Sequence, residues 1–149
     1  MNARNFAMFL GVVFVFVGIA GFIPGLNHMG ATGHDEHLVV TNPGHGMLLG
    51  LFHVNVLHNC VHILFGVLGI IAARGGWAVG YCRFVAIAYI ALAAMGSFSF
   101  GNMKYTFGFI PIEGNDVWLH ALIGVFAAIF GWVVPGSKPT SPAAPTSVA

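Results

Sequence analysis

Charged side chains are scarce in this chain of 149 residues, where Asp, Glu, Lys and Arg together make up 6%. A soluble domain of ordinary composition carries about 25% charged residues. The chain therefore has too few charges to cover a surface that faces water, and its 58% hydrophobic residues point to a lipid bilayer as its natural solvent. The net charge is only +1. Binding to nucleic acid is not expected, because it requires clustered Lys and Arg.

Common catalytic motifs are also missing. The sequence contains no CxxC pair, no HExxH pattern and no glycine-rich phosphate loop. No nucleophile is accompanied by an evident base and orienting group. The two cysteines, Cys60 and Cys82, fall near opposite membrane faces, so we predict two buried packing residues rather than a disulfide. An enzyme is not expected.

Long apolar runs dominate what is present, and four of them occupy residues 6–22, 56–73, 77–98 and 117–134. Each is close to the roughly 20 residues that cross a hydrocarbon core. The runs are continuous and do not alternate with polar residues, which favours helices over strands. The sequence predicts an all-α integral membrane bundle of four helices, in one domain over residues 1–134.

Three segments lie outside these spans. Residues 24–46 form a histidine-rich loop, and the stretch "GMLLGLFHV" just before the second span is predicted to be a short helical turn or a helical lead-in. Residues 135–149 are rich in Pro, Ser and Ala, which is typical of a disordered tail.

The distribution of basic residues predicts the orientation. Arg4, Arg74, Arg83 and Lys138 fall on one side of the membrane and Lys104 on the other. Since basic residues concentrate on the cytoplasmic side, both termini and the tail are predicted to be cytoplasmic, in the inner membrane of a bacterium.

The chain also shows signs of an internal repeat. "HILFGV" resembles "HALIGV", and "MFLGVVFVFVGIAG" resembles "RFVAIAYIALAAMG". These pairs predict a bundle made of two repeated helix hairpins. Parallel repeats of this kind occur in transporters, so a small transporter is one alternative for the function.

Polar residues in two of the spans share a face with glycines. His58, His62 and Gly66 lie on one stripe of the second span, and Asp116, His120 and Gly124 do so on the fourth. Glycine allows close approach of helices in lipid, so both stripes should face inward. Overlaying the repeats sets His62 level with His120 and predicts a bond between the His58 ring and the Asp116 carboxylate. Asn55 and Asn115 precede helix starts and are candidate N-caps.

Several roles remain open for these residues. As a structural polar core, the set would hold the helices in register: Asn55, His58, Asn59, His62, Asn115, Asp116 and His120. His62 and His120 on facing helices suit the axial positions of haem or another tetrapyrrole. A transition-metal site would use His58, His62, His120 and Asp116. His34 and His37, in the loop, are a second candidate metal pair. An ion path is disfavoured, because both stripes lack ionisable groups beyond Gly66 and Gly124.

Two long motifs resemble a known family. "GLFHVNVLHNCVHILFGVLGI" and "NDVWLHALIGV" look like the bacterial family known as domain of unknown function 4383, over about residues 1–134. His53 departs from the resemblance, because the family pattern has a proline there. The resemblance implies a small four-helix membrane protein and no established activity. The positions that match the family pattern are Asn55, His58, Asn59, His62, Gly66, Asn115, His120 and Gly124.

The expected function is therefore non-catalytic. The size of the chain and its apolar surface predict an accessory or scaffold subunit of a larger membrane complex, photosynthetic or respiratory. Its expected partners are the lipid bilayer and other membrane subunits or a second copy. The alternative from a different class is a protein that binds haem or a metal through the His and Asp residues.

Overall fold

The computed structural model describes residues 1–29, 45–97, 105–106, 109–112 and 114–134. The predicted metal pair of His34 and His37 lies outside the described residues, and so does the predicted tail.

Four helices make up most of the described chain. They are α1 (Ala3–Ala20), α3 (Val56–Gly75), α4 (Ala78–Ser97) and α5 (Asn115–Ala128), which the π-helix η2 (Ile129–Val133) continues. All four are long and apolar enough to cross a membrane. The prediction of a mostly helical four-helix membrane bundle is confirmed.

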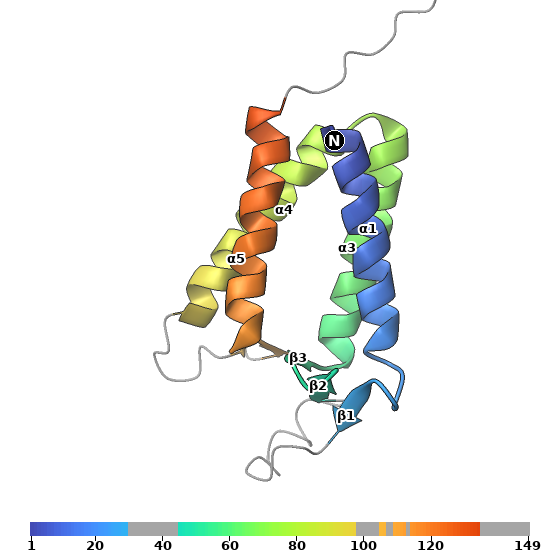
Figure 1. Cartoon of the computed structure of the whole chain (residues 1–149), viewed down its shortest axis with the longest axis vertical. Coiled ribbons are helices and arrows are strands. Elements are labelled where there is room, and N and C mark those ends of the chain that lie inside the picture. Colours follow the sequence, from blue (N-terminus) through green and yellow to red (C-terminus); the bar gives the residue numbers. More distant parts are fainter. Residues whose placement is uncertain (30–44, 98–104, 107–108, 113, 135–149) are drawn as a thin grey trace, which may run out of the picture.

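The helices form two antiparallel pairs, α1 with α3 and α4 with α5 (Figure 1). Glycines set the closest approach within each pair. A Cβ added to Gly66 would lie 2.6 Å from the backbone nitrogen of Val15 on α1, and one added to Gly124 would lie 2.7 Å from the Ile90 side chain on α4. The predicted inward glycines are confirmed. Toward the end that carries the strands, the two pairs diverge (Figure 1).

Short strands cover that end, which we call the sheet end. β1 (Asn27–Met29), β2 (Gly46–Leu48) and β3 (Phe52–Val54) form an antiparallel sheet in that order, and β4 (Tyr105–Thr106) pairs with β5 (Ile110–Pro111).

The helical prediction for "GMLLGLFHV" is wrong, because this stretch forms the hairpin of β2 and β3. Leu49 and Gly50 make its turn with φ of 54° and 69°. The Leu51 N–H donates to the Leu48 carbonyl at 3.0 Å, and two positive φ values are typical of the central residues of such a hairpin turn. A short apolar run has no periodicity that separates helix from strand, so the sequence pattern did not reveal the hairpin.

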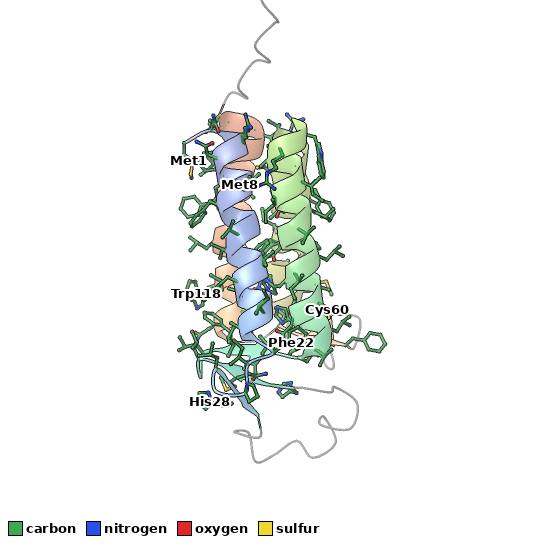
Figure 2. The ribbon with its side chains drawn as sticks, turned by 90° about the vertical axis from the view of Figure 1, so that its right-hand side faces the viewer. Met1, Met8, Phe22, His28, Cys60 and Trp118 are labelled. Carbon is green, nitrogen blue, oxygen red and sulfur yellow. The ribbon has the colours of Figure 1, made fainter. Side chains whose placement is uncertain are left out.

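At the other end, which we call the turn end, buried apolar side chains of all four helices form the core. There the ring of Phe6 stacks on that of Phe130 with centroids 4.4 Å apart, and the Tyr81 hydroxyl donates to the Phe65 carbonyl at 2.9 Å. Large apolar side chains point outward along the helices, as a lipid-facing surface requires (Figure 2). Cys82 is buried as predicted, but Cys60 is exposed, so that part of the cysteine prediction is wrong.

Candidate functional site

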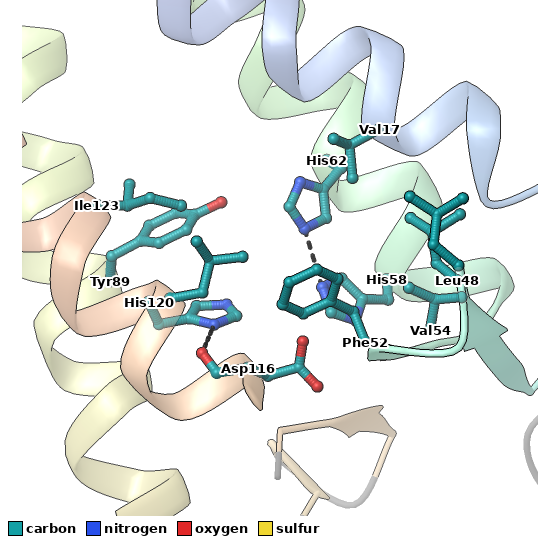
Figure 3. Close-up of a pocket in the computed structure, with 12 residues that line it drawn as sticks. Val17, Leu48, Phe52, Val54, His58, His62, Tyr89, Asp116, His120 and Ile123 are labelled. Carbon is teal, nitrogen blue, oxygen red and sulfur yellow. Dashed lines mark hydrogen bonds between the residues drawn. The ribbon is translucent and has the colours of Figure 1, made fainter. Parts of the chain in front are cut away.

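A cavity of about 120 Å³ lies between the two helix pairs, next to the sheet (Figure 3). We call it the histidine pocket. Its walls are mostly apolar, with polar groups gathered from three helices, an arrangement typical of small-ligand sites. The apolar lining consists of Val17, Leu48, Leu49, Phe52, Val54, Leu119 and Ile123, and the polar lining of His58, His62, Tyr89, Asp116 and His120.

His58 and His62 stand one turn apart on α3 and face each other. Their Nε2 atoms are 2.9 Å apart, and their rings lie 4.7 Å apart at an angle of 23°. Asn55 positions this turn, because its Oδ1 accepts the backbone N–H of His58 at 2.8 Å. The amide of Asn55 also donates to the Phe109 carbonyl at 2.6 Å. The prediction that Asn55 caps the helix is confirmed, and it also fixes α3 to the chain that leads into α5.

His120 enters the pocket from α5 in a defined tautomer. Its Nδ1 lies 2.6 Å from the Asp116 carbonyl. Because a carbonyl can only accept, Nδ1 carries the hydrogen, and the Nε2 lone pair is left available. Tyr89 stacks on the His120 ring at 4.9 Å, and its hydroxyl points into the pocket (Figure 3). The rings of His120 and His58 are 6.3 Å apart.

The predicted bond between His58 and Asp116 is wrong. The Nε2 of His58 faces His62 instead. Oδ2 of Asp116 accepts the backbone N–H of His53 at 3.1 Å and lies 3.8 Å from Nδ1 of the same residue. The reason is that β3 runs past the first turn of α5, so its backbone reaches the carboxylate. Sequence reasoning left His53 without a role, and only the pairing of β3 with the bundle reveals it.

The two remaining asparagines differ in their roles. Asn59 is buried where α3 meets the end of α1, and a Cβ added to Gly21 would overlap its side chain. The N-cap prediction for Asn115 is wrong, because α5 begins at that residue after Gly114. Its amide donates to the Leu51 carbonyl at 3.2 Å, and its Oδ1 accepts the indole N–H of Trp118 at 3.2 Å. Asn115 therefore links α5 to the β2–β3 hairpin.

The dimensions of the pocket decide which groups fit. The ring that faces His62 is that of His58 on the same helix, and not that of His120. A single ion or a small molecule fits. In the part of the chain that the structure describes, no three His, Cys, Asp or Glu side chains are grouped to hold a metal ion. His58 and His62 provide a pair of facing imidazole nitrogens.

Comparison with known proteins identifies the family. The model of the family described as Domain of unknown function (DUF4383) matches residues 4–133. The chain belongs to this family. Neither the curated proteins nor the solved structures include a match to the chain.

Membership of DUF4383 confirms the resemblance carried by the motifs around His58 and His120. The match takes in all four helices and the whole histidine pocket. Because the family description names no activity, the function has to be argued from the chemistry of the pocket.

Proposed function

We propose that this DUF4383 protein is a non-catalytic protein of the bacterial cytoplasmic membrane that binds one transition-metal ion in its histidine pocket. The observation that carries the proposal is the 2.9 Å separation between Nε2 of His58 and Nε2 of His62. An imidazole nitrogen binds such ions at about 2.0–2.1 Å. Two nitrogens on one ion are then about 2.9 Å apart at a right angle and about 3.4 Å apart near the tetrahedral angle.

The same separation also suits an N–H···N hydrogen bond, so other features of the pocket have to favour a metal. One of them is burial, because the rings of both His58 and His62 are buried. A hydrogen bond that serves only to hold the fold would have little reason to place two adjacent imidazoles in a membrane span, where polar groups are costly.

His120 supplies the third ligand in this proposal. Metal-binding histidines commonly donate the other ring N–H to a carbonyl or carboxylate, which fixes the tautomer. The bond from Nδ1 of His120 to the Asp116 carbonyl has this form. The rings of His120 and His58 are 6.3 Å apart, so α5 has to move toward α3, with this bond kept, to complete the set. The remaining space suits water as a further ligand.

The ligand set favours particular ions. Two or three neutral imidazoles with water suit zinc, copper, nickel and iron, whereas magnesium and calcium prefer oxygen. No substrate-activating base is needed for this role, which agrees with the expectation of a non-catalytic protein.

In the orientation that we propose, the pocket lies near the outer surface. The described arginines Arg4, Arg74 and Arg83 are all on the helix ends away from the sheet. Basic residues concentrate on the cytoplasmic side of membrane proteins. This distribution supports an orientation in which the sheet end faces away from the cytoplasm and the N-terminus lies in the cytoplasm.

The test is metal binding by protein purified in mild detergent, stripped with chelator and reloaded with Co²⁺. We expect one ion per chain and visible absorption bands typical of nitrogen ligands. His62→Ala should lose both. His28→Ala is the matched control, because His28 lies exposed on β1 away from the pocket (Figure 2), and it should bind as the wild type does. Equal Co²⁺ content in the wild type and in His62→Ala would refute the proposal.

A second candidate is the accessory subunit predicted from the sequence. The outer face of α1 favours it, because Phe9 and Phe16 are 60% and 70% exposed and need a cover of lipid or of another subunit. Photo-crosslinking from position 16 in native membranes, compared with position 87 on α4, would test this role. One reproducible protein product from α1 alone would support it, and lipid adducts from both sites would argue against it.

A further inference from the structure

Arg83 is a charged residue within the span formed by α4, on the outside of the bundle. The helix begins at Ala78, so Arg83 lies about 8 Å along the axis from its start, toward the turn end. The residue is exposed. A charge set back from the end of a span is costly in lipid unless it has a partner. The contacts of the guanidinium therefore show which partner it can take.

One edge of the guanidinium is fixed to η2, which lies beside α4 at the turn end (Figure 1). The Nε of Arg83 donates to the Gly131 carbonyl at 2.8 Å. Four positions later the chain has Pro135, which has no N–H to donate to that carbonyl. Glycine permits the approach, because a Cβ at position 131 would lie 3.0 Å from Cγ of Arg83. The side chain is therefore held against η2.

The Trp132 ring supports the guanidinium from η2. The central carbon of the guanidinium, Cζ of Arg83, lies 5.6 Å from the centroid of the Trp132 ring. This distance is within the range of about 6 Å for a cation–π contact. Trp132 is itself 53% exposed, and tryptophan is typical of the level of the lipid headgroups. Together the two residues present a cation and an aromatic ring to the surrounding lipid.

The rest of the guanidinium lacks an anionic partner in the described chain. Asp116 is the one Asp or Glu residue that the structure describes, and it lies in the first turn of α5, at the sheet end. The terminal Nη groups of Arg83 make no hydrogen bond to any described residue. An arginine has five N–H donors. All but the one on Nε are therefore available to an acceptor from outside the described chain.

We propose that Arg83, Gly131 and Trp132 form a binding site for the phosphate of an anionic phospholipid, which we call the headgroup site. The Nη groups donate to two phosphate oxygens, in the planar arrangement that suits arginine and phosphate. The bond from Nε to the Gly131 carbonyl keeps the guanidinium in place. The site lies on the outside of the bundle at the turn end, so it does not depend on the function proposed for the histidine pocket.

The surface around the headgroup site favours a lipid over a free phosphate ion. Phe84 and Ile87 are 51% and 65% exposed, and Ile87 lies one turn beyond Arg83 on the same face of α4. Acyl chains cover this apolar surface while the phosphate meets the guanidinium. Arg4 and Arg74 add positive charge at the turn end. Such charge attracts anionic lipids more than zwitterionic ones.

The test is lipid binding by protein purified in a non-ionic detergent and titrated with phosphatidylglycerol or phosphatidylcholine, followed by native mass spectrometry. We expect the wild type to bind the first phosphatidylglycerol at least about tenfold more tightly, as charge-assisted hydrogen bonds commonly provide. Arg83→Gln should lose this preference. Arg83→Lys should lose most of it, because an ammonium group lacks the planar fork. Arg74→Gln is the matched control, since it removes an exposed arginine of the same end, and it should keep the preference.

Each outcome bears on the headgroup site. Equal binding of the two lipids by the wild type would refute it. Equal losses in Arg83→Gln and Arg74→Gln would also refute it, because the general charge of the turn end would then explain the binding. Release of phosphatidylglycerol by excess inorganic phosphate would point to a site for free anions instead. If Arg83→Gln does not fold, Trp132→Leu decides: it keeps the charge and should weaken phosphatidylglycerol binding about threefold, and unchanged binding would contradict the site.

Discussion

Gly66 offers a sharp test of how α1 and α3 pack beneath the histidine pocket. A Cβ at this position would lie 2.6 Å from the backbone nitrogen of Val15 and 2.7 Å from the carbonyl oxygen of Gly11. Both are backbone atoms, so Gly66→Ala must push the helices apart, and overpacking of this kind costs about 1–3 kcal/mol. The higher helix propensity of alanine offsets up to about 1 kcal/mol of this cost. We expect the free energy of unfolding to fall by about 1–2 kcal/mol.

The measurement is unfolding by SDS in mixed micelles, followed by tryptophan fluorescence. Two glycines provide matched controls. A Cβ on Gly80 in α4 would meet nothing within 4 Å, so Gly80→Ala should be neutral or slightly stabilising. At Gly124 the nearest atom is the Ile90 side chain at 2.7 Å, which can move, so Gly124→Ala should fall between the other two.

The order of the three variants is the decisive result. If Gly66→Ala proved as stable as Gly80→Ala, contact between the backbones of α1 and α3 would not limit their packing. The position of His62, one turn before Gly66, could then not be explained by that crossing.

Three further predictions concern the sheet end and the thiols. Asn55→Ala should lower the free energy of unfolding by about 2 kcal/mol, because it removes both the helix cap and the bond to the Phe109 carbonyl. Asn55→Asp should keep the cap and lower the free energy of unfolding by less in the same SDS titration. Leu49→Gly should raise the free energy of unfolding by about 1 kcal/mol, since φ of 54° strains a residue with a Cβ. A lower free energy of unfolding in this variant would contradict that strain. A membrane-permeant maleimide should modify exposed Cys60 and spare buried Cys82 by mass spectrometry; equal modification would contradict the burial.

The helices and their inward faces could be predicted from the sequence because lipid enforces them. A transmembrane segment has no water in the bilayer core to hydrogen-bond with, so its backbone groups have to bond to one another. A long apolar run therefore predicts a helix with little ambiguity. Within α3, the glycines and histidines share a stripe that only the interior of the bundle can accept, and His58, His62 and Gly66 are all buried. The internal repeat, in contrast, remains a prediction, although its two hairpins coincide with the two helix pairs.

The wrong predictions concern residues whose contacts are set by the tertiary structure and not by the local sequence pattern. The His58–Asp116 prediction assumed that the helices meet in the register of the repeat, but the β2–β3 hairpin inserts His53 above Asp116. That hairpin was itself missed, because its apolar residues are too few to show a period. The cavity could not be predicted, since it depends on how far the two helix pairs diverge.

The position of the polar residues limits every function considered for this bundle. Imidazoles and carboxylates are costly in hydrocarbon, and here they gather where the sheet covers the opening between the helix pairs. Stacked aromatic rings such as Phe6 and Phe130 fill the opposite half. This distribution supports the proposal that a ligand of the histidine pocket reaches it from the sheet end.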